Sequence, residues 1–155
     1  MLIPILLGSE SDKEFAAKIT RVLDEFKAPY EIVVVSAHKA PEKVFKIVQK
    51  LNKSSDSVCY ITIAGRSNGL SGVAAGSSIH PVIACPPFNS KKDYLINIHS
   101  TLQMPSDAPV LTVIDPANAA LAALKILALK NPNLKKKIEG RIKKVKQSFN
   151  IKKIC

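Results

Sequence analysis

A glycine-rich segment between two apolar runs places the strongest constraint on how this chain folds. Residues 58–64 form one apolar run, residues 81–85 form the next, and four of the six glycines lie between them, at positions 65, 69, 72 and 76. Continuous apolar runs of this length are typical of buried strands in a parallel sheet. Glycine permits positive φ angles and close approach to the backbone, so the segment is either a binding loop or a tight connection that lets a helix pack.

The rest of the chain alternates short apolar runs with segments of helical periodicity. Besides the two runs above, strands are expected at residues 2–7, 30–35 and 110–114. Ser11 and Glu14 fit a capping box at the start of the first helix. The second helix is expected to begin near Pro41 and to turn Val44, Phe45, Val48 and Leu51 inward. Further helices are expected over residues 92–101, from Pro116 onward, and after Pro132. Five strands alternating with helices predict a parallel α/β sheet with right-handed crossovers.

Length and composition indicate one domain over residues 1–155. The chain is 46% hydrophobic, which allows a substantial core but not two ordinary domains. It has no apolar stretch near the roughly 20 residues that a membrane span needs, and no secretory signal pattern follows Met1. We therefore expect a cytoplasmic protein without a membrane partner. Cys59, Cys85 and Cys155 lack metal-site spacing, and we expect them to be two core residues and a terminal thiol.

The net charge of +11 is concentrated in the last segment. Residues 130–155 hold ten Lys or Arg side chains against one acid, Glu139, and so carry +9 of that charge. A basic helix without interleaved aromatic residues is typical of a solvated face, so we expect no nucleic-acid partner. Its apolar stripe is narrow and must lie against either its own domain or a neighbouring subunit. The stripe consists of Leu134, Ile138, Ile142, Val145 and Phe149.

Three loops that follow the first three expected strands carry the candidate functional residues. Ser9 and Ser11 lie where a helix begins, which suits either a phosphate or an ordinary capped helix. His38 and Lys39 lie at the carboxyl end of the second strand, where ligands bind in open parallel sheets. His38 could act as a general acid or base there, although a loop histidine can also be incidental. Walker and dinucleotide-binding spacings are absent from the sequence.

Four short motifs, in this order and at these separations, resemble one enzyme family. They are Gly-Ser-Glu-Ser-Asp at 8–12, Ser-Ala-His-Lys-Ala-Pro at 36–41, Ala-Gly-Arg-Ser-Asn-Gly-Leu at 64–70 and Cys-Pro-Pro at 85–87. Together they resemble the catalytic subunit family of phosphoribosylaminoimidazole carboxylase, which acts in purine biosynthesis. The resemblance covers residues 2–130. It implies a flavodoxin-like three-layer sandwich with a five-stranded parallel sheet, an extra basic helix over residues 131–155, and a homo-octamer.

The family contains two classes that differ in the third loop. Mutases move a carboxylate already carried by the substrate, and their loop resembles Ala-Gly-Ala-Gly-Gly followed by a histidine. Carboxylases use carbon dioxide directly. This chain has no histidine in residues 64–72, and Lys39 stands where mutases usually have arginine. It resembles the carboxylase class, which implies an enzyme acting on aminoimidazole ribonucleotide (AIR) and carbon dioxide. Bifunctional animal enzymes of this class also carry a succinocarboxamide synthetase domain, which this sequence lacks, so we expect a free-standing carboxylase. The alternatives are a mutase of the same family and a non-catalytic flavodoxin-like binding module.

The resemblance also implies a role for each candidate residue. His38, the only histidine on the three loops, would remove the proton from the carboxylated ring carbon. Carbon dioxide or the new carboxylate would lie against Gly65 and Ser67, with Arg66 either supporting it or serving the fold. No metal, ATP, biotin or other cofactor is called for. The ribose phosphate and hydroxyls would be held by Ser9, Ser11 and Asp12, with Ser36 and Lys39 adding hydrogen bonds and charge.

Overall fold

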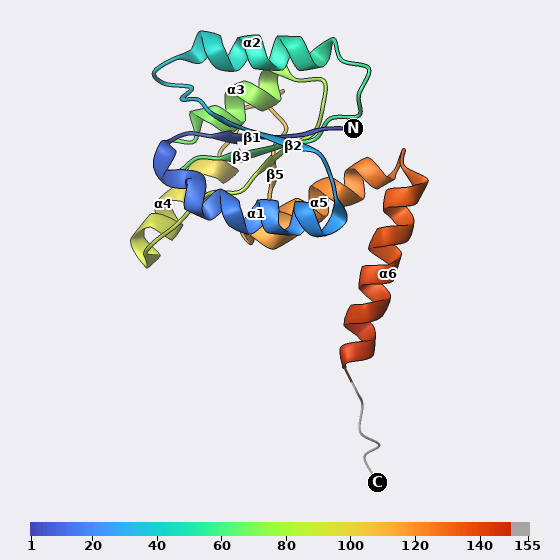
Figure 1. The fold of residues 1–155 in the computed structure, drawn as a ribbon. Helices are drawn as coiled ribbons and strands as arrows, with labels where there is room; N and C mark the ends of the chain where they lie inside the picture. The colour runs from blue at the N-terminus through green and yellow to red at the C-terminus, as the bar shows by residue number, and fades with distance from the viewer. Residues whose placement is uncertain (150–155) are drawn as a thin grey trace.

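The computed structural model describes residues 1–149 and contains a five-stranded sheet flanked by helices (Figure 1). The strands are β1 (Ile3–Leu7), β2 (Tyr30–Val34), β3 (Tyr60–Ile63), β4 (Val82–Ala84) and β5 (Leu111–Thr112). The helices are the short 3-10 helix η1 (Glu10–Asp12), α1 (Lys13–Phe26), α2 (Pro41–Asn52), α3 (Gly69–Ser77), α4 (Lys91–Leu102), α5 (Pro116–Ala128) and α6 (Pro132–Ser148). The predicted alternation of strands and helices is confirmed.

The sheet is wholly parallel, with the strand order β2-β1-β3-β4-β5. The chain moves outward from β1 to β2, then crosses back to β3 on the other side of β1. In such a sheet, ligands bind outside the carboxyl ends of the strands where the order reverses. Leu7 at the end of β1 is level with Val34 in β2 and Ile63 in β3. The loops after these three strands therefore begin at one edge.

Two apolar cores lie on opposite faces of the sheet. One is built from alternate residues of β1, β3 and β4 together with the inner faces of α1 and α5. The other joins the opposite faces of those strands to α2 and α3. Every residue of β1, β3 and β4 is buried, which confirms the expectation drawn from their unbroken apolar runs. Figure 1 shows the resulting three layers, with α2 and α3 on one side of the sheet and α1 and α5 on the other.

The first helical segment begins two residues earlier than the sequence indicated. Ser9, not Ser11, is the N-cap of η1, and its capping-box partner is Asp12 rather than Glu14. The backbone N–H of Ser9 donates to Asp12 Oδ2 at 3.0 Å, and the N–H of Ser11 donates to Ser9 Oγ at 3.3 Å. The prediction was wrong because residues 9–12 fit a capping box as well as the overlapping residues 11–14 do, and the earlier box forms directly where β1 ends.

Two further expectations were wrong in detail, one about the burial of Phe45 and one about the length of the fifth strand. Val44 and Val48 of α2 are fully buried as predicted, but 46% of Phe45 is exposed. The inner face of α2 is narrow, because it covers only the α3 side of the second core. The fifth strand extends over Leu111–Thr112 instead of residues 110–114. It is an edge strand with one neighbour, the three-residue β4, so few ladder positions are available to it.

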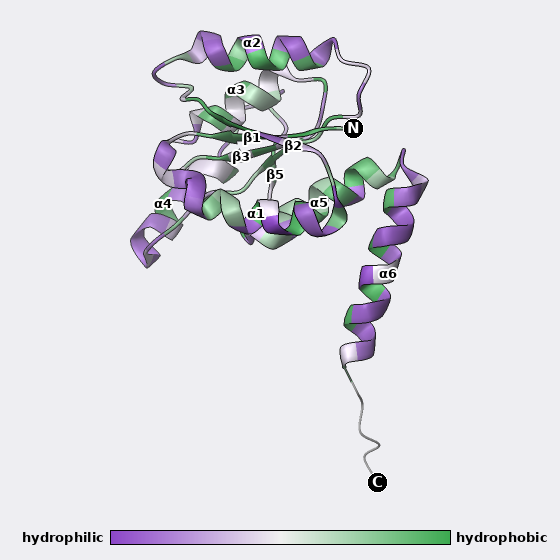
Figure 2. Cartoon of the chain, viewed as in Figure 1, coloured by the Kyte–Doolittle hydropathy of each residue, from purple (hydrophilic) through white to green (hydrophobic). Residues whose placement is uncertain are grey.

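Helix α6 begins on its own domain and then leaves it. Leu134 and Ile138 are buried with α5 and α1, and Lys137 donates to the carbonyl oxygen of Phe26 at 2.8 Å. Arg141 pairs with Glu25 of α1. Further along, three apolar side chains of the predicted stripe are exposed. These are Ile142, Val145 and Phe149. Figure 2 shows α6 as a mostly hydrophilic helix with a few hydrophobic positions. Residues 150–155, which include the expected terminal thiol of Cys155, lie outside the described residues.

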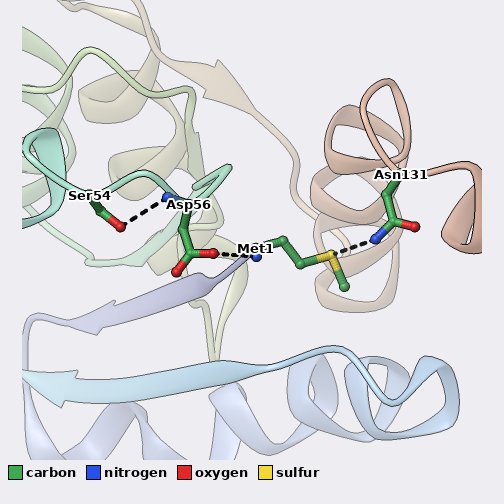
Figure 3. A network of polar contacts seen from close by, with 4 residues as sticks. All are labelled: Met1, Ser54, Asp56 and Asn131. Atoms are coloured by element: carbon green, nitrogen blue, oxygen red, sulfur yellow. Dashed lines mark hydrogen bonds and ion pairs between the residues drawn. The ribbon is translucent and has the colours of Figure 1, made fainter.

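The amino terminus joins β1 to two distant segments (Figure 3). The amino group of Met1 lies 2.6 Å from Asp56 Oδ1, in the connection between α2 and β3. The Met1 sulfur lies 3.6 Å from the Nδ2 of Asn131, which is the N-cap of α6. These contacts lie at the amino-terminal end of β1, opposite to the edge where the three loops begin.

Within residues 1–149, no helix is both long enough and apolar enough to span a membrane.

Candidate active site

A cavity of about 610 Å³ opens at the carboxyl edge of β1, β2 and β3. The strand order reverses at this point, so the cavity lies where doubly wound sheets bind ligands. The structure brings all nine candidate residues together at its wall, although they come from three separate segments of the sequence. They are Ser9, Ser11, Asp12, Ser36, His38, Lys39, Gly65, Arg66 and Ser67.

The loop after β1 presents hydroxyl and carboxylate groups rather than free backbone donors. The Ser11 hydroxyl donates to Ser9 Oγ at 2.9 Å, and the N–H of Asp12 donates to the Ser9 carbonyl oxygen at 3.1 Å. Because the N–H groups of Ser9, Ser11 and Asp12 have partners within the turn, the proposed anion site cannot rest on them. Burial raises the pKa of the Asp12 carboxyl group, although its hydrogen bond from the Ser9 backbone acts in the opposite direction.

The loop after β2 holds His38 and Lys39 in a turn that leads into α2. Ser36 Oγ accepts a hydrogen bond from the N–H of Lys39 at 3.3 Å, and the Ser36 carbonyl oxygen accepts one from Ala40 at 2.9 Å. Pro41 occupies the first turn of α2, where its missing N–H costs nothing. The turn is therefore fixed by its own hydrogen bonds, and it directs the imidazole toward the third loop.

The third loop, after β3, contacts the His38 imidazole at the cavity wall. Ser67 Oγ lies 3.5 Å from His38 Nε2. Between Gly65 and Ser67, Arg66 adopts a left-handed backbone conformation with φ 57°. A non-glycine residue in this region is uncommon and is strained unless its surroundings hold it. Here the N–H of Arg66 donates to Asn97 Oδ1 of α4 at 2.5 Å.

The glycines of this loop are needed for close packing and not for positive φ angles. No glycine of the described chain has a positive φ, so that part of the sequence argument was wrong. A Cβ at position 69 would lie 2.9 Å from His38 Nε2, and one at position 65 would lie 2.8 Å from Asn97 Nδ2. Each glycine therefore leaves room for a side chain that comes from another loop or helix. The expectation that a ligand approaches the loop backbone closely stays a prediction, because the neighbours seen here are protein groups.

Sequence reasoning assigned no role to α4, which supplies polar side chains behind the third loop. Asn97 and Thr101 lie four residues apart on one face of α4, and this spacing is the signal that could have indicated their role. The five buried polar residues of the described chain are connected by hydrogen bonds, and we call them the buried polar network. Its members are Thr62, Asn68, Ser71, Asn97 and Thr101. The cavity wall also includes Lys18, Phe88, Asn89 and Asp93, which the sequence analysis did not single out.

The described cysteines take no part in the site. Cys59 and Cys85 are fully buried, as predicted, and neither lines the cavity. Burial raises the pKa of each thiol to about 12, so neither is a thiolate near neutral pH. Among residues 1–149, no group of three or more His, Cys, Asp or Glu side chains is arranged to hold a metal ion.

Fold and site together define a flavodoxin-like α/β enzyme, with its cavity at the point where the strand order reverses. A family model described as AIR carboxylase matches residues 2–148. Because that match covers nearly the whole chain, the protein belongs to the AIR carboxylase family.

Individual relatives and a solved structure agree with this family. The chain is 40% identical over 134 residues to a phosphoribosylaminoimidazole carboxylase of Archaeoglobus fulgidus, covering 86% of this chain and 73% of the relative. It is 45% identical over 151 residues to an N5-carboxyaminoimidazole ribonucleotide mutase of Methanocaldococcus jannaschii, covering 96% and 93%. The crystal structure of PurE from Treponema denticola is similar with a TM-score of 0.88 and 37% identity, covering 95% of this chain and 92% of that one.

Proposed function

We propose that this protein carboxylates AIR with free carbon dioxide, giving 4-carboxy-5-aminoimidazole ribonucleotide (CAIR). The observation that carries the proposal is the meeting of His38 with the third loop, where Ser67 Oγ lies 3.5 Å from His38 Nε2 at the wall of the cavity. This arrangement puts a group that can accept a proton beside a loop that can hold a small acid group. A carboxylation that ends with loss of a ring proton needs these two elements at one place.

The nucleotide end of the substrate is assigned to the first two loops. The Ser9 hydroxyl and the ammonium group of Lys39 suit a phosphate, because they supply a donor and a positive charge at one wall of the cavity. The Ser11 hydroxyl, which donates to Ser9 Oγ in this structure, would turn to add a second donor. Asp12 is assigned to the ribose hydroxyls, since a carboxylate accepts hydrogen bonds from them and would repel a phosphate. Ser36 would add a donor beside Lys39.

His38 is assigned the proton transfer. Carbon 4 of AIR is nucleophilic because the ring is an enamine, and its electron pair forms the bond to carbon dioxide. The product of that step carries both a carboxylate and a proton on carbon 4. Transfer of this proton to the imidazole returns the bonding pair to the ring and restores its aromaticity. In the reverse direction, protonated His38 gives the proton to carbon 4, and carbon dioxide leaves.

Carbon dioxide and the new carboxylate are assigned to Gly65 and Ser67. The backbone N–H of Arg66 is engaged by Asn97, so it is not the donor for this group. The Ser67 hydroxyl faces the same side as the imidazole and can donate to a carboxylate oxygen. Arg66 is given a supporting role through its left-handed backbone, which turns the loop toward the cavity.

The choice of carbon dioxide over a carbamate substrate rests on the composition of the third loop. Residues 64–72 contain no histidine, and His38 is the only imidazole at the cavity wall. A mutase must remove a carboxylate from nitrogen and add it to carbon, so it must manage protons at two atoms. The named relatives include both a carboxylase and a mutase, so mutase activity is the second candidate.

We also propose that the protein is a cytoplasmic homo-octamer. Two exposed apolar surfaces support assembly. On α4, the large apolar side chains of Leu95, Ile96 and Leu102 are about half exposed or more. The outer half of α6 exposes Ile142 and Val145. Apolar surface of this kind is typical of contacts between subunits.

The first test is turnover of CAIR by the wild-type protein and by His38→Asn. Wild type should release carbon dioxide and form AIR without ATP. His38→Asn should lose at least about 100-fold in rate, because general acid–base catalysis contributes 10² to 10⁴. Asparagine is similar in shape, so the melting temperature and nucleotide binding should change little. The matched control is His80→Asn, whose imidazole contacts the Leu51 carbonyl oxygen outside the cavity wall and which should keep wild-type activity.

Two results would contradict the assignment. A wild-type protein that binds the nucleotide but turns over neither CAIR nor N5-carboxyaminoimidazole ribonucleotide would be a binding module. If His38→Asn retained more than a hundredth of the wild-type rate, another group would be the proton carrier.

A further inference from the structure

We infer that Asn97 of α4 is a positioning residue that sets the geometry of the carbon dioxide end of the site by joining the loops after β3 and β4. This inference rests on the proposed function, because that function assigns carbon dioxide to the loop after β3. The role of Asn97 follows from which atoms its amide group contacts.

The amide group of Asn97 contacts both loops at once. Its Oδ1 accepts from the N–H of Arg66 at 2.5 Å, and its Nδ2 donates to the carbonyl oxygen of Pro87 at 2.5 Å. Gly65, Arg66 and Pro87 all line the cavity. The side chain is buried, with 7% exposed, so water does not compete for either bond. One amide therefore fixes the separation of two walls of the site.

The Arg66 contact also holds a backbone that would otherwise relax. The left-handed conformation of Arg66 is unfavourable for a residue with a side chain, and such conformations persist only where the surroundings impose them. The N–H of Arg66 would be left without its partner if Asn97 were removed. Gly65 is fitted to the same amide, because a Cβ there would lie 2.8 Å from Asn97 Nδ2. The loop therefore needs the Asn97 amide to hold Arg66 in place, and the amide fits only because residue 65 is a glycine.

The rest of the buried polar network holds the same loop from behind. The N–H of Asn68 donates to Ser100 Oγ at 2.7 Å, and Asn68 Nδ2 donates to Thr101 Oγ1 at 2.9 Å. Thr101 in turn donates to the Asn97 carbonyl oxygen at 2.7 Å. On the sheet side, Ser71 Oγ donates to Asn68 Oδ1 at 2.8 Å. The buried polar residues of the described chain are thus all gathered behind the loop after β3.

Loss of the Asn97 contacts is expected to affect the use of carbon dioxide and not the binding of AIR. The residues assigned to the nucleotide lie on the loops after β1 and β2, which Asn97 does not contact. Displacement of the third loop should therefore weaken use of carbon dioxide and leave nucleotide binding nearly unchanged. A misplacement of about 1 Å in a reacting group can cost about 100-fold in rate.

The test compares Asn97→Leu with Val48→Ala. Leucine has the same number and branching of side-chain heavy atoms as asparagine and loses both hydrogen bonds. Val48→Ala removes buried apolar contacts in α2, so it is the control for loss of stability alone. We expect Asn97→Leu to lower kcat/KM for carbon dioxide about 10- to 100-fold, with less than a threefold change in the dissociation constant for AIR. Val48→Ala should lower the melting temperature without changing either constant by more than about twofold.

A second variant separates positioning from general damage. In Asn97→Asp, the ionised carboxylate keeps an acceptor for Arg66 but cannot donate to Pro87. Once protonated, the carboxyl group can make both bonds. The rate of CAIR decarboxylation by Asn97→Asp, divided by the wild-type rate at the same pH, should therefore rise as the pH falls through the pKa of the introduced group. A ratio that does not change with pH would overturn the inference.

Amide hydrogen exchange distinguishes failure of this inference from failure of the proposed function. The Arg66 amide should exchange at least about tenfold faster in Asn97→Leu than in Val48→Ala. If wild type uses no carbon dioxide, the proposed function fails, and the exchange comparison still tests whether Asn97 positions the loop. If wild type is active and Asn97→Leu keeps its kcat/KM for carbon dioxide, the inference is wrong. Equal exchange at Arg66 in the two variants would also overturn it.

Discussion

Helices α4 and α5 have nearly the same length but are attached to the protein by opposite kinds of contact. The buried residues of α5 are all apolar and belong to the larger core. The buried residues of α4 are Asn97 and Thr101, while its large apolar residues Leu95 and Leu102 are exposed. Burial of apolar surface is non-directional and gives stability, whereas hydrogen bonds fix groups in particular positions. The difference indicates that α5 supports the fold and that α4 supports the site.

The largest effect on stability is expected from Leu124→Ala in α5. Leu124 is fully buried, so its truncation should lower the free energy of unfolding by about 2–5 kcal/mol. The kinetic constants should stay close to wild type at temperatures where the variant is folded, because Leu124 lies in the core and does not line the cavity. Denaturant unfolding and steady-state kinetics on the same preparation check both parts. A tenfold loss of kcat/KM in folded protein would contradict the distinction between the two helices.

A smaller loss of stability is expected from Thr101→Val in α4, with a larger loss of activity. Valine has nearly the shape of threonine, but it leaves Asn68 Nδ2 without its partner, which costs about 1–3 kcal/mol. Asn68 belongs to the third loop, so kcat should fall although the unfolding energy changes less than in Leu124→Ala. The two variants should therefore rank in opposite order for stability and for activity. The same rank order in both measurements would show that α4 is an ordinary stabilising helix.

The same contrast explains which parts of the molecule could be predicted from the sequence. Helix α5 and strands β1, β3 and β4 follow from apolar periodicity and unbroken apolar runs, because burial is a property of each residue type. The loops carrying Ser9, His38 and Ser67 were placed at one edge by the rule for parallel sheets. Helix α4 was predicted as an element, but its role depends on hydrogen bonds to Arg66 and Asn68, which lie about 30 positions earlier in the chain. The four-residue spacing of Asn97 and Thr101 indicates a polar face on α4, but no local pattern identifies the partners of that face.

Two wrong predictions have the same physical origin. Capping boxes at Ser9 and Ser11 are equally compatible with the sequence, and the end of β1 decides between them. The glycines at 65 and 69 suggested positive φ angles, but the neighbours His38 and Asn97 are what require them. In each case, the local structure is determined by a contact with a segment that lies elsewhere in the fold.

The smallest effect on the active site is expected from a substitution in the exposed half of α6. We predict that Val145→Glu lowers the oligomeric mass measured by light scattering, because a charge on the exposed apolar stripe would oppose a contact with another subunit. The unfolding energy should change by less than about 0.5 kcal/mol, as is usual for exposed positions. Gln147→Glu makes the same change of charge outside the apolar stripe and is the matched control. An oligomeric mass that is the same in Val145→Glu and in wild type would place the subunit contact elsewhere.

The central claim, that the third loop receives free carbon dioxide, is tested most directly by isotope incorporation. The protein is supplied with AIR and labelled bicarbonate, with carbonic anhydrase to keep carbon dioxide at equilibrium and without ATP. We predict that the CAIR formed carries the label at the specific activity of the bicarbonate, and that unlabelled N5-carboxyaminoimidazole ribonucleotide is a poor substrate. Efficient conversion of N5-carboxyaminoimidazole ribonucleotide to unlabelled CAIR in the presence of labelled bicarbonate would contradict the account and identify a mutase.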